Sequence, residues 1–191
     1  MTLPNPEFRR RVRALAESQW HEPVVVVYLE DVKPEFDVPG RRKDGTVKGR
    51  RLVRRFFWNI FRGTVGGLVS AVLSIGGGGA VHVFVLFGRV TGTENAQALG
   101  LVDAARPAKA PWLVYSPSHV AVVDSGYTFY DPADSPPPTL LWHAARPHAP
   151  LVSPTHRRLT WPDGSVFEYH LSGLEANFLK QSHDVDLGRD G

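Results

Sequence analysis

WLVYSPSHVAVVD, residues 112–124, contains two runs of β-forming residues joined by a Ser-Pro-Ser stretch. Proline and serine favour tight turns, so these residues predict two antiparallel strands in a hairpin. A second hairpin is predicted by RRLTWPDGSVFEYH, residues 157–170, in which Pro-Asp-Gly supplies the turn. Further short β-like runs lie at residues 80–87, 126–130 and 139–143. The second half of the chain is therefore expected to be a succession of short strands.

The first 48 residues predict a helix, a strand and a polar linker. Asn5 and Pro6 fit the cap and the first position of a short helix over residues 5–20. Residues 24–29, VVVVYL, form a continuous β-branched run that predicts a buried strand. Residues 33–49 are polar and contain several glycines and prolines, which predicts a linker.

Residues 49–79 predict a long, basic, amphipathic helix. Apolar residues recur in pairs about every four positions over residues 52–73, a spacing that a helix produces and a strand does not. Four glycines at 76–79 are expected to end this helix. The residues expected to contact a membrane or a partner are Arg50, Arg51, Arg54, Arg55, Phe56, Phe57, Trp58, Phe61 and Arg62, and those expected at a helix–helix contact are Gly63, Gly67 and Ala71.

The composition indicates a domain with much β structure and no disulfides. A chain of 191 residues suits one domain with additional segments, and 18 glycines and 16 prolines favour β structure with many turns. The absence of cysteine excludes disulfides and thiolate metal sites and fits a reducing compartment. The N-terminus is charged and lacks an apolar run, so no secretory signal is expected. We therefore expect a cytoplasmic protein, peripheral at the inner face of the membrane.

Motifs for catalysis or for metal binding are not found in the sequence. The eight histidines show no metal-ligand spacing, and the tetraglycine stretch lacks the residues of a phosphate-binding loop. Ser116, Ser118 and His119 place hydroxyls beside an imidazole, but a turn between two strands explains them better than a nucleophilic site does. The sequence thus predicts no catalytic residues, no metal and no cofactor, which means a protein that is not an enzyme.

The order of elements over residues 80–181 resembles that of bacterial pleckstrin-homology-like domains. The resemblance rests on the two hairpins and on a closing helix, whose start has the capping-box residues Ser172 and Glu175. It implies an α+β fold: a small antiparallel β-barrel closed by a C-terminal helix, which serves as a binding scaffold for lipid or protein. The chain is then expected to divide into an N-terminal region (1–48), the basic helix (49–79), the β domain (80–181) and a tail (182–191).

Three functions fit the basic helix. In the first, a non-enzymatic, membrane-peripheral binding or adaptor protein contacts anionic lipid through its arginines. In the second, a soluble protein-interaction module packs the helix on the β domain, on a partner or on a second copy in a homo-oligomer. The third, nucleic-acid binding, ranks last because no nucleic-acid-binding module accompanies the arginines. We take the first as the expectation, with an anionic membrane surface or a protein as the partner.

Overall fold

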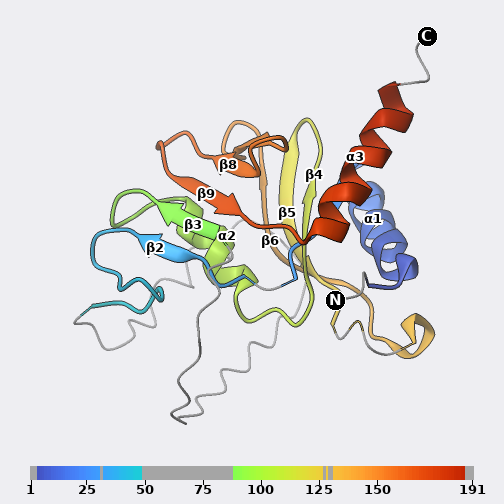
Figure 1. Ribbon diagram of the computed structural model, residues 1–191, viewed down its shortest axis with the longest axis horizontal. Helices are drawn as coiled ribbons and strands as arrows, with labels where there is room; N and C mark the ends of the chain where they lie inside the picture. Colours follow the sequence, from blue (N-terminus) through green and yellow to red (C-terminus); the bar gives the residue numbers. More distant parts are fainter. Residues whose placement is uncertain (1–3, 31, 49–87, 127, 129–130, 188–191) are drawn as a thin grey trace.

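The computed structural model describes residues 4–30, 32–48, 88–126, 128 and 131–187. For residues 181–187 it describes the backbone alone. This part of the chain has the predicted α+β class, with helices and strands packed together (Figure 1). The helices are α1 (Pro6–Trp20), α2 (Ala98–Ala105), α3 (Gly173–Leu187) and a short 3-10 helix, η3 (Pro132–Asp134). The strands are β1 (Val25–Tyr28), β2 (Glu35–Asp37), β3 (Gly88–Thr91), β4 (Pro111–Tyr115), β5 (His119–Asp124), β6 (Thr139–Ala145), β7 (Leu151–Ser153), β8 (Arg158–Thr160) and β9 (Val166–Tyr169).

The strands form two separate sheets rather than the predicted closed barrel. The first sheet has the order β1-β4-β5-β6, and the second has the order β2-β3-β9-β8-β7. All described pairs are antiparallel except β2 with β3. The chain passes from the last strand of one sheet to the last strand of the other through residues 146–150. Pro147 and Pro150 lie in this connection and have no N–H to continue a ladder, so the two edges are not joined there.

Both sheets combine residues from before and after the basic segment. Val25 to Tyr28 in β1 pair with β4, and β2 pairs with β3. The predicted polar linker at 33–49 is therefore wrong for its first part, because Phe36 in β2 and the following Val38 are buried. The backbone N–H of Phe36 also donates to the carbonyl of Lys43, which covers the outer edge of β2 with the chain's own loop.

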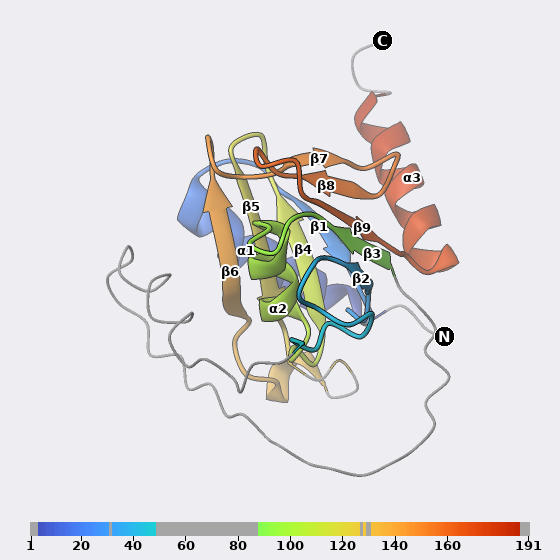
Figure 2. The ribbon, with the colours of Figure 1, turned by 90° about the vertical axis from the view of Figure 1, so that its left-hand side faces the viewer.

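The core has two layers, and β4 contributes to both. Its alternate side chains point to opposite faces. Leu113 and Tyr115 face the core between the sheets, whereas Trp112 and Val114 face α1. The helix α2, which the sequence did not predict, packs in the core between the sheets (Figure 2). Residues 112–115 are thus buried on both faces, which explains their nearly continuous apolar sequence.

Helix α3 is fastened to the body by the side chain of Glu175, which is fully buried. Its carboxylate accepts hydrogen bonds from Arg9 of α1 at 2.6 Å and from the backbone N–H of Tyr28 in β1 at 2.9 Å. Arg9 also donates to the carbonyl of Val26 at 2.5 Å. Because β1 is an edge strand, alternate backbone groups face away from β4, and the Arg9–Glu175 pair satisfies two of them.

One of the two hydrogen bonds of the predicted capping box is present. The Ser172 hydroxyl accepts a hydrogen bond from the backbone N–H of Glu175 at 3.2 Å. The Glu175 side chain binds Arg9 and β1 instead of returning to the helix start. The capping residue therefore has a tertiary role that its local pattern does not reveal.

Replacing Arg9 with Met should lower the free energy of unfolding by about 3–5 kcal/mol, because it leaves the buried Glu175 carboxylate without its counter-charge. Urea denaturation followed by circular dichroism measures the change. The double replacement with Glu175→Met should cost less than the sum of the two single replacements. The control is Arg10→Met, since Arg10 lies on the exposed side of α1, and it should change stability by less than about 0.5 kcal/mol. Equal effects at Arg9 and Arg10 would contradict the assigned role of the pair.

Candidate functional site

The predicted membrane-contact and helix-packing residues lie outside the described residues, because all of them fall within 49–87. Their assignment stays a prediction. The structure does describe the loop that leads to them, residues 38–48. Among the helices in the described part of the chain, none is both long and apolar enough to cross a bilayer.

The loop leading into the basic segment is held in one conformation by polar contacts. The Arg41 guanidinium binds the Asp103 carboxylate of α2 with two hydrogen bonds, of 2.8 and 2.5 Å. Gly45 has φ of +83°, and a Cβ there would lie 2.5 Å from the ring of Phe36. The loop therefore has a fixed shape, which positions the exposed side chains of Arg42, Lys43 and Lys48.

A pocket of about 330 Å³ lies between the β4–β5 turn and the connection from β6 to β7. It opens where the two sheets end, next to the start of β1. We call it the turn pocket. Its buried lining residues are Tyr115, Val120, Ala149 and Pro150, and its exposed rim residues are Pro23, Pro117, Arg146 and Leu151. The remaining lining residues are Val25, Ser116, Ser118, His119 and Val152.

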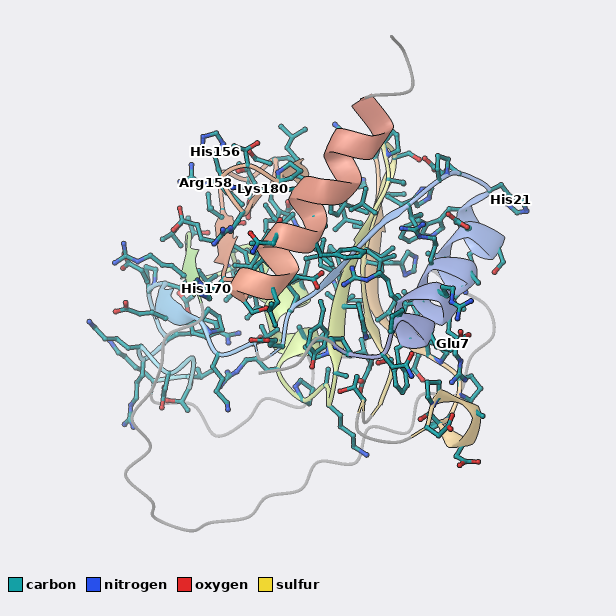
Figure 3. The ribbon with its side chains drawn as sticks, turned by 45° about the vertical axis from the view of Figure 1, so that its right-hand side comes forward. Glu7, His21, His156, Arg158, His170 and Lys180 are labelled. Carbon is teal, nitrogen blue, oxygen red and sulfur yellow. The ribbon has the colours of Figure 1, made fainter. Side chains whose placement is uncertain are left out.

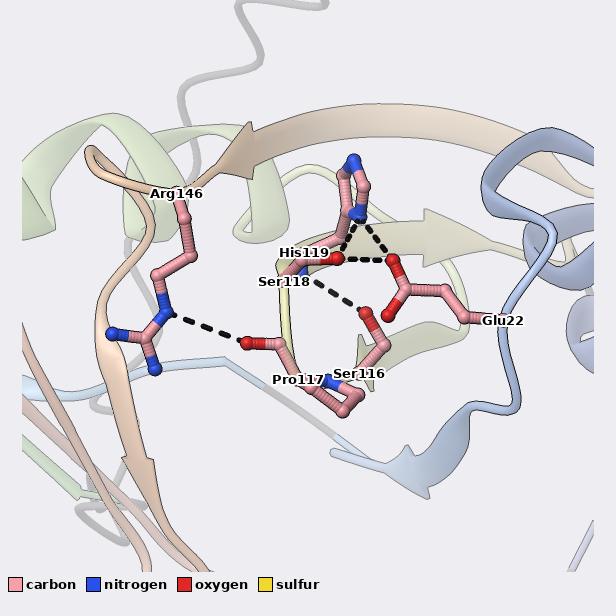
Figure 4. Close-up of polar contacts among 6 residues, drawn as sticks. All are labelled: Glu22, Ser116, Pro117, Ser118, His119 and Arg146. Carbon is pink, nitrogen blue, oxygen red and sulfur yellow. Dashed lines mark hydrogen bonds and ion pairs between the residues drawn. The ribbon is translucent and has the colours of Figure 1, made fainter.

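A polar cluster on the β4–β5 turn borders this pocket (Figure 4). Ser118 Oγ donates to Glu22 Oε1, and His119 Nδ1 lies 2.9 Å from the same carboxylate oxygen. The backbone N–H of His119 donates to Ser116 Oγ at 3.0 Å, which closes the turn. The His119 ring also stacks on Trp20 at the end of α1, with 4.9 Å between the ring centroids. The predicted turn between two strands is confirmed.

The cluster does not have the geometry of a nucleophilic relay. In such a relay the acid binds one ring nitrogen of histidine and the nucleophilic hydroxyl binds the other. Here Ser118 Oγ lies 3.0 Å from His119 Nδ1, the nitrogen that also faces Glu22. The Ser118 hydroxyl is in addition bonded directly to Glu22. The cluster instead ties the α1–β1 connection to the β4–β5 turn and so fixes one wall of the pocket.

Hydrogen bonding and burial change the pKa values of two groups at the site. The Ser118 hydrogen bond is the largest cause that lowers the pKa of Glu22, and the His119 contact adds to it. Burial raises the pKa of Tyr115 to about 12. Tyr115 therefore stays neutral and Glu22 stays ionised near neutral pH.

The part of the chain that the structure describes contains no cluster of metal-ligating side chains. No group of three or more His, Asp or Glu side chains there is arranged to hold an ion. Figure 3 shows His21 beyond the end of α1, on the opposite side of the molecule from His156 and His170. These histidines lie on separate elements, so they do not form a common site.

Comparison of the chain with protein-family models, with curated proteins and with solved structures gives no match. Function is therefore inferred from the residues of this chain. Sequence reasoning found the β4–β5 turn but missed the pocket, because Pro23, Arg146 and Leu151 come from distant stretches without a shared motif. The proline-rich neighbourhood of Arg146 was the one local signal of an irregular connection.

Ser118→Ala should raise the pKa of Glu22 toward its ordinary value of 4.5, because it removes the largest cause of the depression. NMR titration of the Glu22 side-chain carboxyl carbon measures this shift. Ser116→Ala is the matched control and should have a smaller effect, since Ser116 contributes less to the depression. A larger effect of Ser116→Ala, or no effect of Ser118→Ala, would disprove this account.

The same shift predicts a pH dependence of stability. The folded-state pKa of Glu22 lies below 4.5, so its ionisation stabilises the fold above that pH, and the contribution is lost as the pH falls through the folded-state pKa. Urea denaturation should show Glu22→Gln to be less stable than the parent chain at about pH 7, with a smaller difference at about pH 3. A difference that grows on acidification would show that the sign is wrong.

Proposed function

We propose that this chain is a non-enzymatic, membrane-peripheral binding or adaptor protein. The basic segment 49–79 contacts anionic lipid, and the two-sheet body serves as the binding scaffold. One observation carries the proposal: residues 41–62 contain nine Lys and Arg residues against a single acid, Asp44, with Phe and Trp residues among them. Arginines mixed with large aromatics are typical of helices that lie in a membrane interface.

The topology supports this proposal. The strands β2 and β3 lie side by side and parallel, with Glu35 opposite Arg89 and Asp37 opposite Thr91. A parallel pair requires a long crossover connection, and residues 49–79 lie within it. Both ends of that connection are anchored in the same sheet. Binding of the segment to a membrane would therefore bring the whole body to the lipid surface.

The expected energy is sufficient for reversible binding. Each arginine near an anionic surface contributes about 1 kcal/mol, so Arg50, Arg51, Arg54, Arg55 and Arg62 together contribute roughly 5 kcal/mol. Burial of the neighbouring aromatic side chains in the interface adds to this. The electrostatic part is screened by salt. Anionic lipid is enriched in the cytoplasmic leaflet, which makes that leaflet the proposed location.

The pleckstrin-homology-like identity of the body stays a prediction within this proposal. It is supported by the β4–β5 hairpin, the β8–β9 hairpin and the helix α3 that follows it. The proposal requires only a rigid scaffold and does not include a closed barrel.

A protein-interaction module is the second candidate, and the surface of α3 favours it. Leu174 and Phe178 are 47% and 38% exposed, and their i, i+4 spacing places them on one side of the helix. An exposed apolar pair of this kind suits contact with a partner or with a second copy of the chain.

Purified protein should co-sediment with anionic vesicles at low salt, and much less with neutral vesicles or at high salt. Changing Arg50, Arg51, Arg54 and Arg55 to Glu should weaken binding to anionic vesicles by roughly a thousandfold, at about 1 kcal/mol for each arginine removed. The matched control changes four cations elsewhere on the body, Arg10, Arg13, Arg158 and Lys180, to Glu. This control alters the net charge equally and should retain most of the binding.

Either of two results would overturn the membrane proposal. One is the absence of binding to both kinds of vesicle, which would leave the second candidate. The other is an equal loss of binding in both charge-reversed variants, which would indicate a general effect of net charge rather than contact by residues 50–55.

A further inference from the structure

The turn pocket contains a single permanent charge. Arg146 is the one Lys or Arg among its lining residues, and no Asp or Glu lines it. The Nε atom of Arg146 makes a long, 3.4 Å bond to the carbonyl of Pro117. Its two terminal nitrogens have no partner in the described part of the chain, and in Figure 4 the guanidinium points away from Glu22. These nitrogens are available to an anion, and their planar arrangement suits an oxyanion.

Tyr115, a buried residue of the pocket lining, is the second residue of interest because its hydroxyl has no partner among the described residues. Tyr115 is only 8% exposed, and its hydroxyl forms no hydrogen bond with the described residues. No fully buried side-chain nitrogen or oxygen among those residues lacks a partner, so the Tyr115 hydroxyl is not completely buried. Tyr115 is among the residues that line the turn pocket. A neutral phenol both donates and accepts, so it can bind either kind of polar group.

The rest of the lining is partly aliphatic and partly polar, the polar residues being Ser116, Ser118 and His119. Val25, Val120, Ala149 and Pro150 provide aliphatic surface. The volume of about 330 Å³ is within the range of small-molecule sites. The pocket lining therefore combines an exposed cation, aliphatic surface and a buried tyrosine.

We propose that the turn pocket binds small monocarboxylates with an apolar middle and a polar far end. The carboxylate binds the Arg146 guanidinium, the apolar part lies against Val25 and Pro150, and the far end reaches the Tyr115 hydroxyl. A single arginine with no second cation suits a monoanion better than a phosphate dianion. This site is separate from the residues assigned to lipid contact and does not depend on them.

The test uses three probes with the same phenylacetyl skeleton: 4-hydroxyphenylacetate, phenylacetate without the hydroxyl group, and the neutral 4-hydroxyphenylacetamide. Binding to the full-length chain is followed by amide chemical shifts in NMR spectra. We expect saturable shifts at Tyr115, Val120 and Ala149, with 4-hydroxyphenylacetate at least about tenfold tighter than its amide. It should also bind more tightly than phenylacetate, which has no group for the Tyr115 hydroxyl.

Four variants separate the parts of the site. Arg146→Gln should abolish the preference for the acid over the amide, whereas Arg146→Lys should keep part of it. Arg158→Gln removes an arginine of β8 that does not line the pocket and should leave the preference unchanged. Tyr115→Phe should remove the advantage of 4-hydroxyphenylacetate over phenylacetate and leave phenylacetate affinity unaltered.

The proposal is overturned if neither acid gives saturable shifts at the pocket residues up to about 10 mM. It is also overturned if the amide binds as tightly as the acid, or if Arg146→Gln leaves the preference intact. An unchanged advantage of the hydroxyl group in Tyr115→Phe would overturn the assignment of Tyr115. None of these results bears on vesicle binding, which is assigned to other residues.

Discussion

The rest of the described fold depends on the buried pair of Arg9 and Glu175. Removing two charged groups from water is costly, and this pair repays the cost because each partner also bonds the backbone of β1, at Val26 and Tyr28. One contact thus joins the first helix, an edge strand and the last helix. The Cζ atom of Arg9 also lies 4.2 Å from the centroid of the Phe178 ring. The Arg9 side chain is therefore only 11% exposed. The first sheet therefore ends in a satisfied edge rather than in a strand open to pairing.

The connection between β6 and β7 explains both the open architecture and the turn pocket. Because Pro147 and Pro150 cannot donate to a ladder, the chain changes sheets there without joining their edges. The same residues then lie across the ends of the sheets, opposite the β4–β5 turn. Glu22 holds that turn through Ser118 and His119, so both walls of the pocket are fixed. A barrel closed at this place would have left no such opening.

Local signals in the sequence predicted what is local in the fold. The two hairpins have turn residues between β-forming runs, and both are present as β4–β5 and β8–β9. The parallel pairing of β2 with β3 depends on residues more than fifty positions apart, for which no local pattern exists. The helix α2 was missed because it is buried between two sheets, so its sequence, ALGLVDAA, lacks a polar face. Glu175 has a capping pattern, yet its partner Arg9 lies 166 positions away.

The two candidate sites also differ in whether their residues are close together in the sequence. The residues proposed to contact lipid form a periodic pattern within one segment, which sequence reasoning can detect but the described structure does not cover. The turn pocket is assembled from β1, the β4–β5 hairpin, the β6–β7 connection and the start of β7, so only the three-dimensional arrangement reveals it. The basic segment instead lies, along the chain, between β2 and β3. The turn pocket is lined by the first sheet and by β7 of the second, whereas the basic segment is anchored at β2 and β3, on the opposite side of the second sheet from β7. The two proposed sites therefore use different strands, and a change at one need not alter the other.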